Sequence, residues 1–286
     1  MAAPASRLIA DIGGTNARFA LTSAGGPVGP TTVMQVRAHA TFADALAAYV
    51  AATGSRFHEA ALAAAGPRDG DAIRLTNAGW TIDPAGVRMV APKAAVAVFN
   101  DLEAVAFALP HLRTDDVDVL AAGAPPAVPA PRLAFNVGTG LGAAVALPGP
   151  AGWRALATEA GHMRFAAATD EEAAIAYAFH TYEDALSGRG FARLEALLPD
   201  ARRRRRVFSR LLGRVAGDLT LATGAWGGID FCGGVLSTWE ENVDFAALKQ
   251  TFLDKGPMAA RMATVPIRRL TAAAPALIGL AHAPIA

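Results

Sequence analysis

The chain has 286 residues, 53% of them hydrophobic, and its 26 basic and 25 acidic side chains leave a formal net charge of +1. This length predicts two domains or lobes, and the apolar content excludes a disordered chain. The balanced charge gives no reason to expect a nucleic-acid or membrane partner, and the single cysteine, Cys232, excludes an internal disulfide framework and a cysteine-rich zinc site. The start, MAAPASRLIAD, lacks the long apolar core of a signal peptide, so we expect a cytoplasmic protein.

The first predicted elements are two strands joined by a Gly-Gly turn, in the stretch LIADIGGTNARFAL from Leu8 to Leu21. Glycine has no Cβ, so the backbone at Gly13-Gly14 can approach a ligand closely and its N–H groups can cradle phosphate oxygens. Thr15-Asn16 adds side-chain donors, and Asp11 can hold a hydrated Mg²⁺. The alternative for this stretch alone is an ordinary hairpin with a buried aspartate.

The rest of the first half alternates strands with helices. The pattern predicts strands at 33–36, 60–65 and 96–99, and helices at 41–52, from Asp83-Pro84, and at 102–109. The last strand ends in Asn100-Asp101, at the carboxyl end where open α/β sheets place their ligands. An aspartate there can accept a proton from a substrate hydroxyl that Asn100 orients. The alternative is that Asp101 only caps the helix.

A second glycine hairpin follows a proline-rich linker at 122–132. The stretch LAFNVGTGLGAAVAL, from Leu133 to Leu147, repeats the plan of strand, glycine turn and strand, with Gly138-Thr139-Gly140 in the turn. Such a duplication predicts two similar lobes, each supplying one phosphate loop. Neither hairpin is a GxxxxGK[ST] loop or a Rossmann fingerprint.

The second half is predicted to hold more helices. One helix is expected to begin at Thr169 with a capping box to Glu172, one at the arginine run 202–206, and one at Asn242 as its cap. Two more are expected at 191–198 and 275–282. Strands are expected at 231–232, before Gly233-Gly234, and at 265–270. Glu159 and His162 form an E-x-x-H set, but the intervening Ala160-Gly161 favours a loop over a helical metal site. A carboxylate and an imidazole in such a loop suit neighbouring sugar hydroxyls, and the alternative is an unrelated pair of solvent-exposed side chains.

Six motifs occur in order along the chain: DIGGTNARFAL, VFNDLEAVAFALP, VGTGLG, TEAGH, EDALSG and DFCGG. Together they resemble the bacterial glucokinase family, ATP-dependent hexose kinases of the hexokinase and actin superfamily. The resemblance implies an α/β fold of two ribonuclease-H-like lobes that close over sugar and MgATP. It implies an N-terminal lobe at 1–110 and a C-terminal lobe at 111–286, with the last helix able to pack back on the first lobe.

The resemblance also implies a role for each matching residue. Asp101 is the expected general base for the sugar 6-hydroxyl, and Gly233 and Gly234 are expected near adenosine. The sugar-binding set implied is Asn100, Asp101, Glu159, His162 and Glu183. The phosphate-binding set implied is Asp11, Gly13, Gly14, Thr15 and Asn16 in the first loop and Gly138, Thr139 and Gly140 in the second, with Asp11 holding Mg²⁺ through water.

Two departures from the family pattern bear on these expectations. Ala160 stands where the family motif has glycine, and its methyl group restricts backbone dihedral angles that glycine would leave free. The related repressor-and-kinase branch carries a cysteine-rich zinc motif that one cysteine cannot supply. We therefore predict a cytoplasmic homodimeric glucokinase that uses ATP and Mg²⁺. The alternatives are a kinase for another hexose and a non-catalytic sugar sensor on the same fold.

Overall fold

A computed structural model describes residues 6–66, 68–75, 78–124 and 126–285. The chain divides into two compact units, each with its own sheet and core. Unit 1 takes the chain up to Leu112, the segment Gly149–Ala155 and the chain from Ala273, and unit 2 takes Arg113–Pro148 and Leu156–Ala272. Residues 1–5, on which the expected lack of a signal peptide partly rests, and residue 125 of the expected linker lie outside the described residues.

The main sheet of unit 1 has the strand order β3-β2-β1-β4-β8. Its first three strands are antiparallel neighbours, whereas β1, β4 and β8 run parallel to one another. The bounds are β1 (Ser6–Ile12), β2 (Asn16–Ser23), β3 (Thr32–Gln35), β4 (Glu59–Ala64) and β8 (Ala95–Asn100). A small antiparallel sheet holds β5 (Arg68–Asp69), β6 (Ala72–Arg74) and β7 (Thr81–Ile82).

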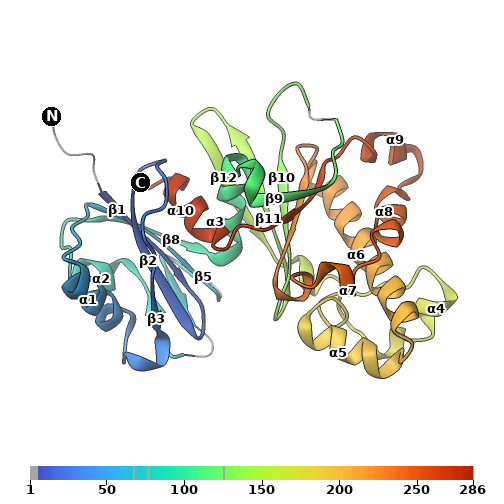
Figure 1. The fold of residues 1–286 in the computed structure, drawn as a ribbon, viewed down its shortest axis with the longest axis horizontal. Coiled ribbons are helices and arrows are strands. Elements are labelled where there is room, and N and C mark those ends of the chain that lie inside the picture. The colour runs from blue at the N-terminus through green and yellow to red at the C-terminus, as the bar shows by residue number, and fades with distance from the viewer. Residues whose placement is uncertain (1–5, 67, 76–77, 125, 286) are drawn as a thin grey trace. The chain divides into compact units, whose positions relative to one another are not determined.

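Helices cover both faces of this sheet (Figure 1). They are α1 (Phe42–Thr53) and α2 (Pro84–Arg88) on one face, and α3 (Asp101–Ala108) and α10 (Pro275–His282) on the other. The helix predicted at 41–52 is confirmed, and a capping box starts it, because the side chains of Thr41 and Asp44 each accept the other's backbone N–H. Alternate residues of β1, such as Leu8 and Ile12, share a buried core with Phe42 of α1, as the period of a strand requires.

The sheet of unit 2 repeats the plan of unit 1, with the order β12-β11-β10-β13-β14-β9. Here too a glycine hairpin, β10 with β11, is followed by parallel neighbours, β13 and β14. The bounds are β9 (Val117–Ala121), β10 (Arg132–Val137), β11 (Leu141–Gly149), β12 (Gly152–Thr158), β13 (Ile229–Cys232) and β14 (Ile267–Leu270). The duplication that the two glycine hairpins predicted is therefore present in the strand order.

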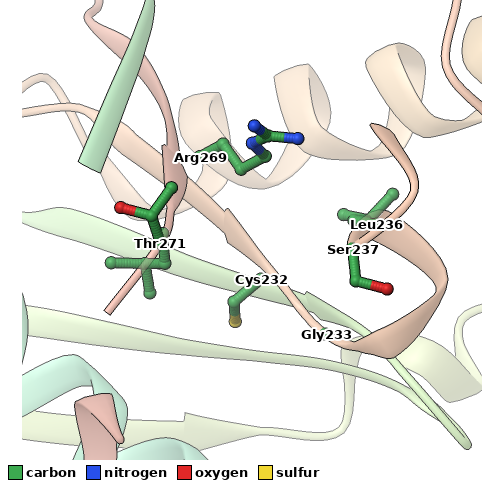
Figure 2. Close-up of a pocket in the computed structure, with 7 residues that line it drawn as sticks. Cys232, Gly233, Leu236, Ser237, Arg269 and Thr271 are labelled. Atoms are coloured by element: carbon green, nitrogen blue, oxygen red, sulfur yellow. The ribbon is translucent and has the colours of Figure 1, made fainter. Parts of the chain in front are cut away.

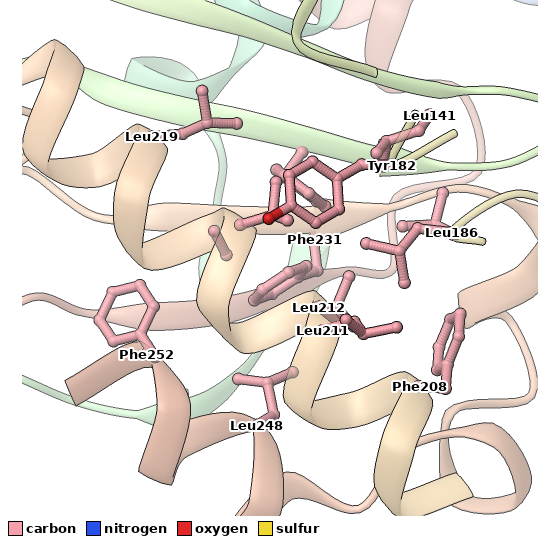
Figure 3. Packing of buried hydrophobic residues seen from close by; sticks show 14 of the residues in the cluster. Leu141, Tyr182, Leu186, Phe208, Leu211, Leu212, Leu219, Phe231, Leu248 and Phe252 are labelled. Atoms are coloured by element: carbon pink, nitrogen blue, oxygen red, sulfur yellow. The ribbon is translucent and has the colours of Figure 1, made fainter. Parts of the chain in front are cut away.

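The helices of unit 2 are α4 (Asp170–Ala173), α5 (Gly188–Leu197), α6 (Ala201–Thr223), α7 (Trp239–Asn242), α8 (Phe245–Leu253) and α9 (Ala259–Met262). Figure 3 shows how α6 presents Phe208, Leu211 and Leu212 to the core that it shares with Phe231 of the sheet. The arginine run opens α6, and Arg203 binds the Glu171 carboxylate. Within the described residues, no helix combines the length and the apolar character that crossing a membrane requires.

Two local expectations are wrong. Asn242 ends the short helix α7, and the cap of the following helix is Asp244, whose side chain accepts the N–H of Ala247. Thr169 caps α4 as expected, but the Glu172 carboxylate does not complete a capping box. It accepts the N–H of Ala168 and pairs with the Arg214 guanidinium 2.8 Å away, because it is buried and needs a cationic partner.

Candidate active site

Asn100 and Asp101 lie where β8 ends and α3 begins. Asn100 is the N-cap: its Oδ1 accepts the N–H of Leu102 at 2.9 Å, and the Glu103 carboxylate accepts the N–H of Asn100 at 2.8 Å. Asp101 follows as the first helical residue, and its Oδ1 also lies 2.9 Å from the N–H of Leu102. Asn100 and Glu103 form the capping box, and Asp101 shares the N–H of Leu102 with Asn100.

Asp11 belongs to the same edge of the sheet as Asp101. The strands β1, β4 and β8 are parallel, so their carboxyl ends meet at one edge. Burial raises the pKa of Asp101 to about 6, and the negative charge of Asp11 adds to that rise. Burial also raises the pKa of Asp11, against the opposing charge of Arg18. A carboxylate whose pKa lies near neutrality suits a general base.

The first glycine turn keeps part of its backbone open. The N–H of Gly13 closes the turn on the carbonyl of Asn16 at 2.9 Å. In the described chain no hydrogen bond engages the N–H of Gly14 or Thr15, and both residues are exposed. The Asn16 side chain is used differently from the expectation, since its Oδ1 accepts the Gln35 amide at 2.6 Å.

The second glycine turn, in unit 2, is one residue shorter than the first. The N–H of Gly138 donates to the carbonyl of Gly140 at 2.9 Å, and Thr139 between them is exposed. The turn joins β10 to β11 as the first turn joins β1 to β2. Each unit thus holds one exposed Gly-Thr turn at the carboxyl end of a central strand.

A cavity of about 280 Å³ lies beside the Gly233-Gly234 turn (Figure 2). Gly233 has φ +106°, and a Cβ there would lie 2.3 Å from the carbonyl oxygen of Val137, so only glycine fits. Arg269 lines the cavity, and its guanidinium is held by Asp118 and Glu240. Ser237 and Thr271 bring hydroxyl groups to the same cavity.

Glu159 and His162 flank a short 3₁₀ turn in unit 2, Ala160–His162. Their side chains are 89% and 65% exposed, and Glu159 Oε2 lies 3.9 Å from His162 Nε2. Ala160 does not disturb the loop: its methyl group is buried in the core, and among the described residues no non-glycine backbone has a positive φ. The departure from the family's glycine is therefore accommodated without strain.

Glu183, the other predicted sugar residue of unit 2, reaches the second glycine turn. Its Oε2 accepts the N–H of Leu141 at 2.9 Å, directly after Gly140. The structure thus brings together, within unit 2, the TEAGH loop, the EDALSG loop and the VGTGLG turn. Within unit 1 it brings together Asp101, Asp11 and the first glycine turn.

Two residues of these sites were not predicted. Arg18 lies 3.3 Å from Asp11 Oδ2 and is the counterion of that carboxylate. The hairpin register places Arg18 directly opposite Asp11, so the opposite charges across a tight turn were the available signal. Arg269 had no such signal, because only the non-local pairing of β14 with β9 brings it to Asp118.

Comparison with known proteins gives one consistent family. A family model described as Glucokinase matches residues 8–205 and 192–285. The chain is 34% identical to a glucokinase of Chromobacterium violaceum, covering 96% of this chain and 88% of that one. It is 33% identical to a glucokinase of Cupriavidus pinatubonensis, covering 97% and 91%.

The fold agrees with solved structures. A glucokinase from an Antarctic psychrotroph matches with TM-score 0.86 and 28% identity over 96% of this chain and 97% of that one. A ROK family glucokinase from Streptomyces griseus, solved with glucose and AMPPNP, matches with TM-score 0.63 and 18% identity over 96% and 98%, which shows the shared fold alone. The chain therefore belongs to the glucokinase family, ATP-dependent hexose kinases that phosphorylate glucose.

Proposed function

We propose that Asp101 is the general base that takes the proton from the 6-hydroxyl of glucose as the γ-phosphate of ATP is transferred to it. The observation that carries this assignment is the pKa of about 6 at the end of β8, produced by burial and by the charge of Asp11. Most of this carboxylate is ionised at neutral pH, yet it is basic enough to accept a proton in the transition state. Asn100, fixed as the N-cap of α3, orients the sugar beside it.

We assign recognition of the other sugar hydroxyls to Glu159, His162 and Glu183. The side chains of Glu159 and His162 are exposed, and among the described residues each pairs with the other, at 3.9 Å, so their polar atoms remain available to a ligand. Two carboxylates and an imidazole supply acceptors and a donor, which matches the alternating hydroxyls of a hexose.

We assign the phosphates of ATP to the two glycine turns. The open N–H groups of Gly14 and Thr15 support the first assignment, and the exposed Thr139 supports the second. The cavity beside Gly233 suits a nucleoside, since it offers apolar Leu236 with the hydroxyls of Ser237 and Thr271. The Streptomyces glucokinase, which shares this fold, is itself solved with glucose and AMPPNP.

The residues of unit 1 fit a hydrated Mg²⁺. Asp11 and Asp101 bring two carboxylates to one sheet edge against a single guanidinium, Arg18, and burial holds the pKa of each carboxyl above its ordinary value. A cation there would relieve this excess negative charge, and Asp11 would hold it through water. When bound, Mg²⁺ offsets the negative charge on the transferred phosphate.

A coupled assay of hexose phosphorylation tests this function. We expect MgATP-dependent turnover with glucose and a lower kcat/KM with fructose or mannose, because hydroxyls missing or inverted at the site leave polar groups unpaired. A sugar sensor would bind glucose without turnover, and a kinase for another hexose would reverse the order. Running the assay with polyphosphate in place of ATP identifies the donor. The cytoplasmic homodimer stays an expectation supported by the family resemblance.

A further inference from the structure

Three loops of unit 2 are locked together by their backbones. The N–H of Glu183 donates to the carbonyl of Gly161 at 2.9 Å, which ties the EDALSG loop to the TEAGH loop. The N–H of Gly188 donates to the carbonyl of Gly138 at 2.8 Å, which ties the EDALSG loop to the second glycine turn. The loop that carries Glu183 thus bridges a sugar loop and a phosphate turn.

These loops pack so closely that a side chain would not fit at two of their glycines without a shift of the neighbouring atoms. A Cβ on Gly140 would lie 2.5 Å from Glu183 Oε2, and a Cβ on Gly161 would lie 2.2 Å from the carbonyl oxygen of Leu141. Both distances are shorter than any real Cβ contact. A Cβ on Gly140 would therefore displace the Glu183 carboxylate, whereas a Cβ on Gly161 would meet a backbone carbonyl.

The two sugar-reading carboxylates differ in their attachment. Glu183 is half-buried and its Oε2 accepts the N–H of Leu141 at 2.9 Å, whereas its Oε1 accepts no hydrogen bond from the described part of the chain. Glu159 is 89% exposed, and its recorded partner is His162. Only Glu183 has one oxygen on the phosphate turn and one oxygen available to a ligand.

We propose that Glu183 is the positioning residue through which a bound sugar fixes the second phosphate turn, so that glucose and nucleotide bind cooperatively. This inference rests on the proposed function, which assigns Glu183 to the sugar and the turn to phosphate. A sugar hydroxyl on Oε1 restricts rotation of the carboxylate about its last bond. The other oxygen then holds the N–H of Leu141, and with it the turn from Gly138 to Gly140, in one orientation.

Cooperativity of this kind is reciprocal, because it is a coupling free energy between two sites. Glucose should tighten nucleotide binding by the factor by which the nucleotide tightens glucose binding. Couplings of this type commonly amount to about five-fold or more. Loss of the Glu183 carboxylate should remove the coupling and also release the turn in the sugar-free protein.

The test is calorimetric titration of Mg²⁺-AMPPNP into the full chain, with and without saturating glucose. The coupling ratio is the Kd without sugar divided by the Kd with sugar. We expect a ratio of about five or more for the wild type and about one for Glu183→Ala. In the absence of glucose, Glu183→Ala should bind AMPPNP roughly 2- to 10-fold more weakly, the usual effect of one lost hydrogen bond.

Two matched variants separate coupling from general damage. Glu183→Gln keeps a carbonyl oxygen that can accept the N–H of Leu141, so its sugar-free AMPPNP affinity should stay close to that of the wild type. Glu159→Ala should weaken glucose binding yet retain the coupling ratio once glucose is saturating. A wild-type ratio in Glu183→Ala, or a ratio of one in Glu159→Ala as well, overturns the inference. A wild-type protein that binds neither ligand contradicts the proposed function instead.

Discussion

At the scale of single residues, the raised pKa of Asp101 has a consequence for stability. The folded protein holds this carboxyl at a pKa of about 6 against an ordinary value of 3.8, so the native state binds more protons than the unfolded state between these values. The contribution of Asp101 to the free energy of unfolding therefore falls as the pH rises through this window and is fully unfavourable above it. The negative charge that lets Asp101 act as a base therefore lowers the free energy of unfolding.

We expect Asp101→Asn to be more stable than the wild type at pH 7, by at most about 3 kcal/mol, since each pKa unit corresponds to about 1.4 kcal/mol. A part of this gain, about 0.5 kcal/mol, is offset because a negative charge at the start of α3 interacts favourably with the helix dipole. Denaturant unfolding at pH 7 and pH 4 measures both effects. The gain should vanish at pH 4, and a variant that is less stable than the wild type at pH 7 would refute this account of the carboxylate.

Asp11 offers a second residue-scale prediction, on the pH dependence of activity. The kcat/KM of the wild type should fall as the pH drops below about 6, because Asp101 becomes protonated. Asp11→Asn removes a negative charge that raises the pKa of Asp101, so the acid limb of its remaining activity should move to lower pH. An acid limb that stays in place, or moves to higher pH, would contradict the coupling of the two carboxyls.

At the scale of elements, the C-terminal helix α10 supports the helix that begins with Asp101. The two helices cross so closely that a Cβ on Gly279 would lie 1.8 Å from the carbonyl oxygen of Ala104 in α3. The last carbonyls of α10 accept the Arg7 guanidinium, at 2.8 Å for Ala283 and 3.0 Å for Ala281. Arg7 lies on β1, the strand that leads to Asp11, so α10 joins both carboxylate-bearing elements of unit 1.

Gly279→Ala should therefore destabilise the protein by about 1–3 kcal/mol, as overpacking at a close contact does. It should also lower kcat, because α3 must shift at its point of contact with α10. Ile278→Ala on the same helix is the control: it removes volume at a partly exposed position and leaves the crossing intact. Thermal unfolding and the glucose assay compare the two. Equal kcat in both variants would show that α10 does not position Asp101.

Elements with local signals were predictable from sequence, and elements set by distant contacts were not. The helix α10 was predicted with its observed bounds because Pro275 marks its start. The edge strands β9 and β12 were missed, since most of their residues are exposed or half-buried and show little apolar alternation. Asp244 carries an ordinary N-cap signal, and the helix start was misplaced because Asn242, two residues earlier, is an equally good capping residue.

The candidate site divides in the same way. The motifs located Asp101 and both glycine turns, because strand ends and glycine turns have local sequence signals. The attachment of Glu183 to Leu141 was not predictable, since it joins residues 42 apart through a backbone N–H that has no sequence signal. The shift in the pKa of Asp101 likewise depends on burial and on Asp11, 90 residues away, which only the fold brings near.

At the scale of the whole molecule, each unit carries one exposed glycine turn, and the sheet of unit 2 follows the strand order of unit 1 with β9 added at one edge. The proposed base, Asp101, lies in unit 1, and the carboxylates proposed to bind sugar hydroxyls, Glu159 and Glu183, lie in unit 2. We propose that a single residue, Asp101, performs the proton transfer, while the remaining site residues position substrate and phosphate. Catalysis by positioning and charge stabilisation is typical of phosphoryl transfer.

The most direct test of this claim is kcat for glucose phosphorylation by Asp101→Asn, measured together with the Kd for glucose. The account predicts a fall in kcat of ~10²–10⁴ with glucose binding largely retained, because the amide still offers a polar contact but accepts no proton. Glu103→Gln, which alters the capping box of the same helix, should lose far less. An Asp101→Asn variant that keeps most of its kcat would contradict the account.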